Sequence, residues 1–476
     1  MSGPSLEGLV SDPRYAQELH AAVDLFGSSP GRWRVLYHND GDGIASASVA
    51  ALALSRLGRP WQLSPLLGVE RAGVERVLRG TRGPLLVVDT GSSFLDLFVS
   101  HGRPVVVLDH HVPPGETPAG ASLAVVNPHH WGDDGMTELS ASMLTYLFAR
   151  LLLPEAVDLL AYGLSGAIAD RMHVGGFRGL NRVLVEEAES RGALRRKKAL
   201  NLSGPSLEEA LATSLDPYLV GVSGRIASAR TFLRELGLPA GAPASTLTEE
   251  EGRRLASALL IRLLAQGARP EFGERIREEL LFLPRAGWEA HELSRLQNAC
   301  GREGEPSVGI ALALGDEASR RRAMELESRW RQGVLEDLER LESAGALHME
   351  AHVQWFETPH SDLAGTVAGL ALAYFADPTR PILTFSLRGE RLKVSSRGTL
   401  WLTERGLNLD RACRAGADRA GGEGGGHAVA SGATIPRGSE KAFLEEVGRV
   451  VGEQIGKLHV GGPGGGPGSP APSVAG

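Results

Sequence analysis

The sequence predicts an α/β protein in which a parallel-sheet domain, a helical connecting domain and a smaller α/β domain follow one another. Residues 32 to about 130 alternate short apolar runs with helical patterns, which is typical of a parallel sheet. Residues 200–345 show helical periodicity, with many Glu and Arg and few β-branched runs. From about residue 348 the alternation of strands and helices returns.

The first domain is predicted to contain five strands, because it has five short apolar runs. An amphipathic helix over Ile44–Leu57 follows the first strand and ends at Gly58 and Pro60. Two further helices are expected near Glu138–Leu153 and Pro154–Asp170. The predicted strands are Arg34–Tyr37, Trp61–Leu66, Leu85–Val88, Val105–Leu108 and Leu123–Val126.

The connecting domain is expected to be helical. Ser206 with Glu209, and Thr248 with Glu251, have the spacing of capping boxes that open helices. The predicted elements after it are a strand over His348–Phe356, a helix over Leu363–Phe375, strands over Ile382–Leu387 and Leu392–Ser396, and a helix over Glu440–Leu458. The predicted domains are 1–195, 196–345 and 346–460, followed by a disordered Gly/Pro tail at 461–476.

Length and composition indicate a globular chain of about three domains. The 476 residues are 42% hydrophobic and 22% charged, which excludes wholesale disorder. No apolar run approaches the ~20 residues of a membrane-spanning helix, and no signal peptide is recognisable at the start. The two cysteines, Cys300 and Cys413, fit a reducing compartment. We therefore expect a cytoplasmic protein without membrane contact.

The basic residues are almost all arginines. Only five of the 50 basic residues are lysines, although the net charge of the chain is −7. Arginine presents a planar fork that binds phosphate. Because the chain is also rich in glycine and alanine, compositional bias is the simpler explanation, and a selected phosphate-binding surface is the alternative.

Acidic and imidazole side chains follow three of the predicted strands. Ligands bind outside the carboxyl ends of strands in an open parallel sheet, so these groups should converge at one edge. They are His38, Asp40 and Asp42 after the first strand, Asp89 after the third, and Asp109, His110 and His111 after the fourth.

Such a set of ligands suits Mn²⁺ or Mg²⁺ better than zinc, since neither cysteine lies near it. Two such ions ~3.5–4 Å apart can stabilise an in-line attack on phosphorus. A single Asp after a strand more often caps the next helix, but three strand ends with two adjacent histidines exceed what caps require. An EF-hand is excluded because Ile44 and Ala51 stand where it needs acids.

Four motifs in this order resemble the DHH phosphoesterase superfamily: HNDGDG (38–43), VVDTG (87–91), LDHH (108–111) and SGAIAD (165–170). The chain is most similar to the RecJ-like single-strand nucleases, especially the archaeal, GINS-associated branch. That similarity includes NPHHWGDDG (127–135) and LQNACGREGEPSVGIALALGD (296–316). The resemblance covers about residues 30–460.

The resemblance implies a role for each of these residues. Asp89 would bridge two divalent cations, Mn²⁺ or Mg²⁺. His111 would face the scissile phosphate as a stabiliser or acid, and Asp109 would orient the histidines from the second shell of ligands. The implied metal ligands are His38, Asp40, Asp42, Asp89, His110 and Asp170.

Two C-terminal segments, VSSRGT (394–399) and the expected loop GGEGGGHAVASGATIP (421–436), resemble the substrate-binding domain that accompanies DHH modules. Successive glycine N–H groups can form an anion-binding nest, to which Arg397 adds a bidentate phosphate contact. On composition alone, the glycines would mark a turn. The implied substrate-binding residues are Ser396, Arg397, Gly424, Gly425, Gly426 and His427.

We predict an exonuclease that hydrolyses single-stranded DNA or RNA, in replication or repair. One alternative is a DHH phosphodiesterase for short oligonucleotides or polyphosphate, which the long helical segment 200–345 argues against. Another is a non-catalytic replisome scaffold, because the family includes a helicase subunit without nuclease activity. The resemblance also implies docking to GINS, a replisome component. The polarity of degradation, DNA against RNA and Mn²⁺ against Mg²⁺ stay open.

Overall fold

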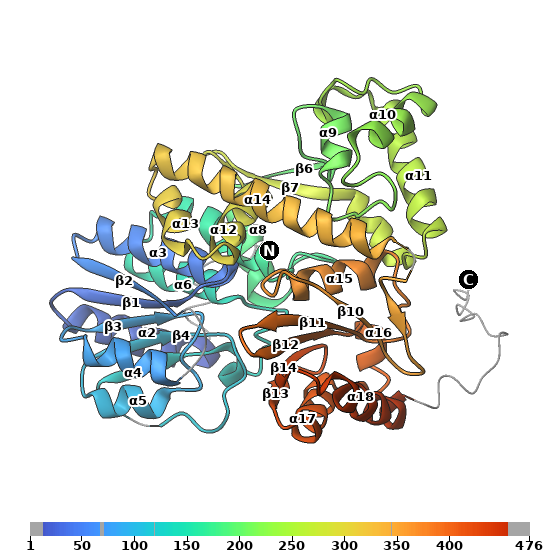
Figure 1. The fold of residues 1–476 in the computed structure, drawn as a ribbon. Helices are drawn as coiled ribbons and strands as arrows, with labels where there is room; N and C mark the ends of the chain where they lie inside the picture. The colour runs from blue at the N-terminus through green and yellow to red at the C-terminus, as the bar shows by residue number, and fades with distance from the viewer. Residues whose placement is uncertain (1–12, 67–70, 119, 344, 456–476) are drawn as a thin grey trace, which may run out of the picture. The chain divides into compact units, whose positions relative to one another are not determined.

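The structure is a computed structural model that describes residues 13–66, 71–118, 120–343 and 345–455. The chain divides into two compact units, each with a large sheet of its own (Figure 1). The three-domain division expected from the sequence stays a prediction. The first unit combines Met1–Ala199 with Glu279–Trp330, and the second combines Leu200–Glu278 with Arg331–Gly476.

The sheet of the first unit has five parallel strands in the order β2-β1-β3-β4-β5. Strands β3 and β4 are apolar and fully buried, as expected where helices cover both faces. The register pairs Tyr37 with Val88 and Val88 with Leu108, so the chain leaves β1, β3 and β4 at one level. The strands are β1 (Trp33–His38), β2 (Trp61–Leu66), β3 (Leu85–Val88), β4 (Val105–Leu108) and β5 (Leu123–Val126).

Helices pack on both faces of this sheet through apolar side chains. One face is covered by α4 (Arg71–Arg79) and α5 (Leu95–His101). The other face is covered by α2 (Pro13–Ser28), α3 (Gly41–Arg56) and α6 (Ala141–Leu152).

A helical layer completes the first unit. Helices α12 and α13 pack on α3 and α7, with Ile44, Cys300 and Ile310 in the shared core. The elements are η1 (Pro128–Trp131), η2 (Val157–Leu159), α7 (Leu160–Ala169), α8 (Gly179–Ser190), α12 (Ala290–Arg302), α13 (Pro306–Ala313), the start of α14 (Glu317–Leu341), and the small sheet of β6 (Arg195–Leu200), β7 (Arg277–Leu283) and β8 (Trp288–Glu289).

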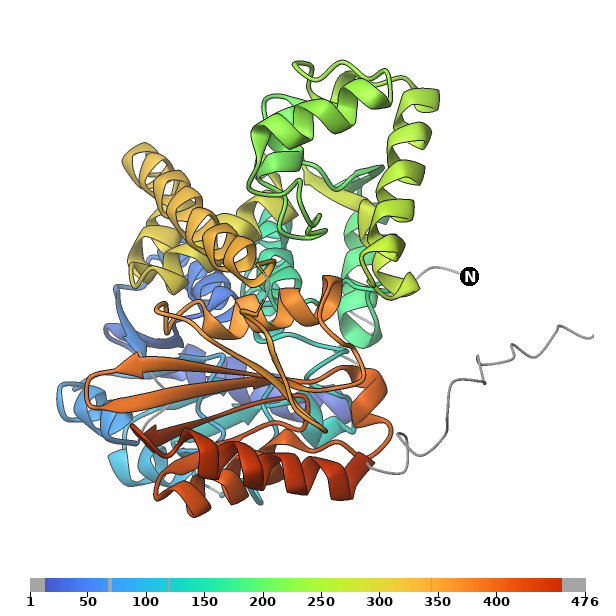
Figure 2. The ribbon, with the colours of Figure 1, turned by 45° about the vertical axis from the view of Figure 1, so that its right-hand side comes forward.

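The second unit contains a six-stranded sheet in the order β13-β14-β12-β11-β10-β9. Strands β10 and β11 are parallel and the other pairs are antiparallel. Figure 2 shows α17 and α18 side by side along this sheet, packed through a core that includes Cys413, Phe443 and Val447. The elements are β9 (His348–Met349), β10 (Gln354–Glu357), α15 (Ala364–Tyr374), β11 (Ile382–Arg388), β12 (Arg391–Arg397), α16 (Leu400–Thr403), α17 (Leu409–Ala420), β13 (Glu423–Gly426), β14 (Ala430–Pro436) and α18 (Glu440–Ile455).

The rest of the second unit is helical. A capping box of Thr248 and Glu251 opens α11, and the Ser206 side chain caps α9 by accepting a hydrogen bond from the N–H of Glu209 at 3.2 Å. The elements are α9 (Leu207–Ala212), α10 (Ile226–Glu235), η3 (Ala244–Thr246), α11 (Glu249–Ala265) and η4 (Pro270–Ile276).

The predicted fold class is confirmed: a parallel-sheet region, a helical region and a C-terminal sheet region are all present. Two predicted elements are wrong. The loop expected over 421–436 is a hairpin of β13 and β14, and the single strand expected over His348–Phe356 is two short strands, β9 and β10, that pair antiparallel. The tail at 461–476 and the end of the helix predicted over Glu440–Leu458 lie outside the described residues. Within the described ranges, every helix is too short or too polar to cross a membrane.

Candidate metal centre

The first candidate ligands lie where β1 turns into α3. Asp40 is the N-cap of α3, and its Oδ1 accepts a hydrogen bond from the N–H of Gly43 at 3.0 Å. Its Oδ2 lies 3.0 Å from Nδ1 of His38. The helix-cap interpretation therefore accounts for one oxygen of Asp40 and leaves the other to face the cluster.

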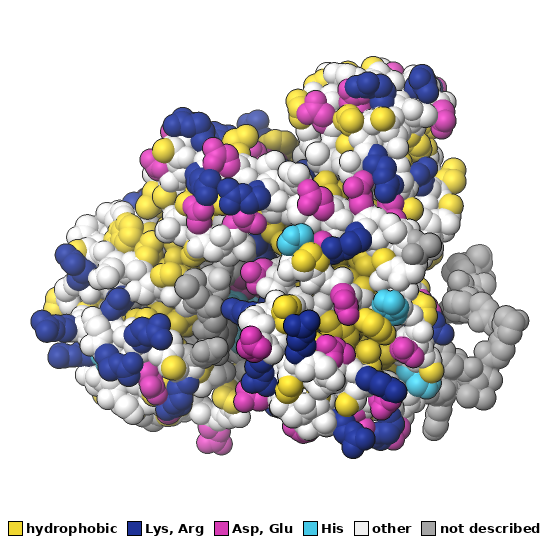
Figure 3. All heavy atoms as spheres, viewed as in Figure 1, with side chains coloured by type: hydrophobic (Ala, Val, Ile, Leu, Met, Phe, Trp, Pro, Cys, Tyr) yellow, Lys and Arg dark blue, Asp and Glu magenta, His cyan; other side chains and the backbone are white. Residues whose placement is uncertain are grey.

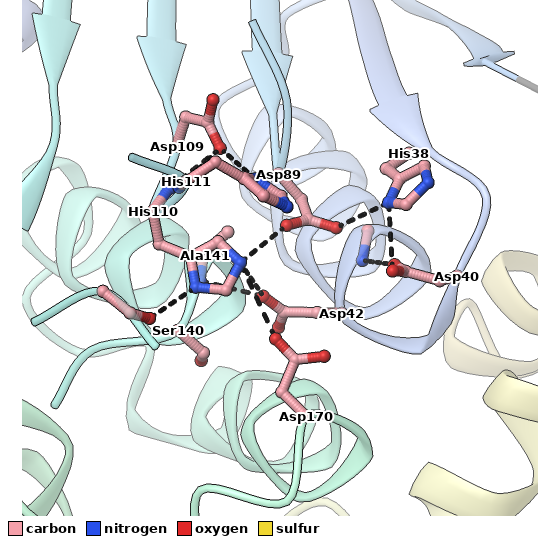
Figure 4. Close-up of polar contacts among 12 residues, drawn as sticks. His38, Asp40, Asp42, Asp89, Asp109, His110, His111, Ser140, Ala141 and Asp170 are labelled. Atoms are coloured by element: carbon pink, nitrogen blue, oxygen red, sulfur yellow. Dashed lines mark hydrogen bonds and ion pairs between the residues drawn. The ribbon is translucent and has the colours of Figure 1, made fainter. Parts of the chain in front are cut away.

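Asp42 is held by the start of another helix. Its Oδ2 accepts a hydrogen bond from the N–H of Ala141 at 2.9 Å, and its Oδ1 accepts one from the N–H of Ser142 at 3.2 Å. These are the first amides of α6, where the helix dipole favours a carboxylate. Only 1% of Asp42 is exposed, and its Oδ2 lies 3.9 Å from Nε2 of His110 (Figure 4).

Asp89 lies between the two histidines that face the cluster. Its backbone has φ +56°, in the left-handed region that Asp enters more readily than most residues. The side chain is 1% exposed, and neither oxygen accepts a hydrogen bond from any residue that the structure describes. Its neighbours are Nδ1 of His38 at 3.5 Å and Nε2 of His110 at 3.2 Å. A buried carboxylate without hydrogen bonds is costly, so this position fits bound cations.

The three residues after β4 have different environments. Oδ1 of Asp109 accepts from the N–H of His110 at 2.9 Å and lies 2.8 Å from Nδ1 of His111. Its Oδ2 accepts from the N–H of Ser92 at 2.8 Å, so the Asp109 carboxylate is already engaged. Nδ1 of His110 lies 2.7 Å from the carbonyl of Gly135. Because a carbonyl only accepts, this Nδ1 carries a proton, and Nε2 faces the carboxylates.

Asp170 reaches the same cluster from the C-terminal end of α7. Its Oδ2 lies 3.7 Å from Nε2 of His110. The next residue, Arg171, has φ +63°, so the chain turns sharply after the carboxylate. Helix α7 approaches α3 closely because of Gly166, where an added Cβ would lie 2.2 Å from Oδ1 of Asp42 and 2.3 Å from Oγ of Ser142.

The seven side chains form three overlapping clusters of potential ligands. Within each cluster, the ligand atoms lie within 4.8 Å of one another. All donors are oxygen or nitrogen, and both cysteines are buried elsewhere, so the set fits Mn²⁺ or Mg²⁺. The number of cations stays a prediction. The clusters are His38 with Asp40 and Asp89, Asp42 with His110 and Asp170, and Asp89 with His110 and His111.

Burial and crowding shift the pKa values of these groups. Burial and the nearby Asp89 raise the pKa of Asp42 to about 7. Burial, with Asp42, raises the pKa of Asp170 well above its usual range. Burial alone would lower the pKa of His38, but the carboxylates of Asp40 and Asp89 raise it to about 11. Without a cation, these groups therefore retain protons that a metal would displace.

Ser396 and Arg397, predicted to bind substrate, lie in the second unit. Ser396 is fully buried. Its Oγ donates a hydrogen bond to the carbonyl of Ser431 at 3.0 Å and lies 3.3 Å from Sγ of Cys413 on α17, so this hydroxyl is engaged in the core. The Arg397 guanidinium donates to the carbonyl of Ser396 at 2.8 Å and lies over Gly365 of α15.

The glycine run forms an edge strand and not the expected nest. Gly424 to Gly426 pair with β14, and amides of a strand point alternately to its two sides. The N–H of Gly426 donates to Oδ1 of Asp410 at 2.8 Å, and the N–H of His427 donates to the carbonyl of Ala430 at 2.8 Å. The side chain of His427 is exposed. A role of these residues in substrate binding stays a prediction.

Sequence reasoning missed the residues that hold the ligand-bearing helices in place. Gln297 is fully buried on α12, and its Nε2 donates to Oγ of Ser48 on α3 at 3.0 Å. Its Oε1 accepts from Oγ of Ser165 on α7 at 2.6 Å. It thereby joins the helices that carry Asp42 and Asp170. These partners are 249 and 132 residues away, and local patterns carry no signal over such separations.

Comparison with known proteins matches two parts of the chain to described domains and finds one relative along most of its length. Residues 33–164 match the DHH family, N-terminal domain, and residues 350–453 match the DHHA1 domain. An uncharacterized protein of Methanocaldococcus jannaschii is 27% identical over 428 residues, which cover 89% of this chain and 94% of that protein.

Solved structures share the fold. RecJ from Thermus thermophilus in complex with Mn²⁺ is 20% identical, with a TM-score of 0.57 over 92% of this chain and 55% of that one. This chain thus spans about half the length of that RecJ chain. The same RecJ in complex with Mg²⁺ is 19% identical, with a TM-score of 0.52 over 92% of this chain and 52% of that one. CDC45 from Entamoeba histolytica is 12% identical, with a TM-score of 0.63 over 95% of this chain and 99% of that one.

The two domain matches, in this order, define the class of DHH proteins that carry a DHHA1 domain. The chain therefore carries a DHH N-terminal domain and a DHHA1 domain, and its fold is similar to that of the solved RecJ structures.

Proposed function

We propose that this protein is a metal-dependent phosphodiesterase that shortens single-stranded DNA or RNA from one end. The observation that carries the proposal is Asp89, whose two buried oxygens have no hydrogen-bond donor among the described residues. It has a strained backbone and stands amid six further Asp and His side chains. Backbone strain and a buried carboxylate without hydrogen bonds both lower stability, and proteins retain such features mainly at functional sites.

The cluster would hold two divalent cations. Asp89 belongs to two of the ligand clusters, so it would contact both ions. When bound, the cations supply Lewis-acid polarisation of the phosphodiester and make a nearby water more acidic. Gly135 and the first amides of α6 fix the orientations of His110 and Asp42 before any cation arrives. The proposed ligands are His38, Asp40, Asp42, Asp89, His110 and Asp170.

His111 would act on the substrate directly. Its side chain is 39% exposed, and its Nδ1 is fixed by Oδ1 of Asp109 at 2.8 Å. Burial lowers the pKa of His111, but the hydrogen bond to Asp109 outweighs it, so the pKa is raised and the imidazolium form is favoured. Its Nε2–H would donate to the phosphate oxygen on which negative charge develops.

The second unit would bind more of the strand. Arg397 would contact a backbone phosphate, together with Gly424, Gly425, Gly426 and His427, while Ser396 would contribute through its backbone. A cytoplasmic location, a role in replication or repair and docking to GINS belong to the same proposal, on the strength of the family resemblance.

One assay tests the proposal: single strands of DNA and RNA, labelled at the 5′ or the 3′ end, are incubated with Mn²⁺, Mg²⁺ or EDTA. We expect progressive shortening with Mn²⁺ or Mg²⁺, none in EDTA, and resistance of a blunt duplex. Faster cleavage of dinucleotides or polyphosphate would favour the small-substrate phosphodiesterase. A folded, Mn²⁺-binding protein that cleaves none of these substrates would favour the scaffold.

A further inference from the structure

A pocket lined by arginines lies at the opposite edge of the same sheet, where β1 and β2 begin and where α4 leads into β3. Its volume is about 600 Å³. In Figure 3, dark blue side chains gather over the region of β1, β3 and α4. None of the lining residues is acidic or aromatic. They are Arg32, Arg34, Gln62, Arg79, Gly80, Thr81, Arg82 and Gly83.

One of the four guanidinium groups is fixed in place by neutral partners. Nε of Arg34 donates to Oγ of Ser64 at 2.8 Å, and its Nη1 donates to Oγ1 of Thr81 at 3.0 Å. Gly80 leaves room for this guanidinium, since an added Cβ would lie 3.3 Å from Nη1. The group is therefore oriented, while its charge is not neutralised by these contacts.

The other three arginines are exposed and add charge with little compensation. Arg79 lies 3.9 Å from a carboxylate oxygen of Glu75, one helical turn away. Arg32 and Arg82 form no ion pair with any acidic side chain in the part of the chain that the structure describes. Four positively charged side chains thus line one pocket, and the lining residues include no carboxylate.

We propose that this pocket binds a small phosphate-rich anion, such as a di- or triphosphate group. Guanidinium forks pair bidentately with phosphate oxygens, and the volume lies in the range of small-molecule sites. A site for a nucleic acid strand would use aromatic side chains to stack bases, and the lining has none. The six residues of β1 separate the pocket from the metal cluster by roughly 20 Å, so one small anion cannot contact both sites.

The test is calorimetric titration of the full chain with inorganic tripolyphosphate in EDTA, which removes cation-mediated binding at the Asp and His cluster. The pocket variant is Arg32→Glu/Arg82→Glu. The control variant, Arg253→Glu/Arg254→Glu, makes the same charge change at exposed positions on α11. Arg32→Gln/Arg82→Gln repeats the test without charge reversal, and thermal unfolding establishes that each variant is folded.

We expect saturable binding by the wild type and the control, and binding weakened at least about tenfold in both pocket variants, as for one lost charge-assisted contact. The proposal is overturned if the wild type does not bind tripolyphosphate saturably, or if binding weakens equally in the pocket and control variants. A single-stranded oligonucleotide is titrated in parallel. If the pocket variants weaken only oligonucleotide binding, the surface contacts a strand and the small-anion assignment is wrong.

Discussion

The two edges of the first unit's parallel sheet collect opposite charges in opposite environments. At the carboxyl edge, Asp42 and Asp89 are buried. Amides of α6 fix Asp42, and a backbone in the left-handed region places Asp89 between two imidazoles. At the amino edge, three of the four arginines are exposed. Like charges repel weakly in water and strongly when buried. The buried carboxylates therefore need cations to offset their mutual repulsion. The exposed arginines are screened by water and are stable without a bound anion.

The largest expected effect is a loss of hydrolysis that occurs in a variant at the carboxyl edge of the sheet and not in a variant at the amino edge. Asp89→Asn keeps the shape of the side chain and tolerates φ +56°, but it removes the charge shared by two ligand clusters. We expect Mn²⁺-dependent hydrolysis of a labelled single strand to fall more than about 100-fold. Arg82→Glu, at the amino edge, should leave hydrolysis unchanged. An equal loss of hydrolysis in the two variants would refute the proposal that only the carboxyl edge carries out hydrolysis.

The next effect distinguishes the chemistry of the carboxyl edge from substrate binding in the second unit. His111→Ala should lower kcat by roughly 10²–10³, as the loss of other donors to a transition state does. Arg397→Ala should mainly raise KM, since it removes binding that ground state and transition state share. Steady-state kinetics of both variants on one labelled strand measure this. An effect of Arg397→Ala on kcat alone would refute the assignment of Arg397 to binding.

A smaller effect is expected from the support beneath the carboxyl edge. Gln297→Leu removes two buried hydrogen bonds, while the hydroxyls of Ser48 and Ser165 keep their bonds to helix carbonyls, and this loss should cost about 1–3 kcal/mol of unfolding free energy. Because α3 and α7 then lose a common anchor, Mn²⁺ affinity should weaken by about tenfold. Gln332→Leu, on the exposed face of α14, is the control. Unaltered Mn²⁺ titrations of a destabilised Gln297→Leu protein would make Gln297 a purely structural residue.

The smallest effect is a pH dependence of stability. The pKa of Asp42 is raised to about 7, above ~3.9 in an unfolded chain, so its ionisation opposes folding as pH rises through this window. The pKa of His38 is raised to about 11, so its contribution is full below ~6.5 and is lost as pH rises. Both groups therefore make the metal-free protein less stable as the pH rises.

In EDTA, therefore, Tm should fall between pH about 5.5 and pH about 8, and the gain in Tm from Mn²⁺ should grow, because metal and protons compete. Asp42→Asn should flatten this dependence. If the metal-free protein gains stability over the same pH range, the raised pKa values of Asp42 and His38 are wrong.

The parallel sheet and the convergence of its acidic groups could be predicted from the sequence. Leu85–Val88 and Val105–Leu108 are strands with the predicted bounds, because a run buried on both faces must be apolar throughout. The topology then requires that residues following such strands meet at one edge. The positions of Asp89 and His110 follow from this rule.

The hairpin at 423–436 could not be predicted in the same way, since glycine disfavours strands. The reason for the glycines is packing: an added Cβ at Gly424 would lie 2.5 Å from the carbonyl of Cys413 on α17. Similarly, the contact of His110 with the carbonyl of Gly135 involves a backbone group, which carries no side-chain signal. Gln297 escaped prediction because its partners are distant in the sequence.

Gly166 has a consequence for how relatives of this protein evolve. Even alanine at this position would place a carbon atom 2.2 Å from Oδ1 of Asp42 and 2.3 Å from Oγ of Ser142, so this glycine serves both the position of a candidate ligand and the packing of α7 on α6. A descendant that loses Asp42 or Asp170, and with them metal binding, would still need this glycine to keep α7 against α6. The glycine of SGAIAD is therefore required by the fold whether or not the aspartate of the same motif binds a cation.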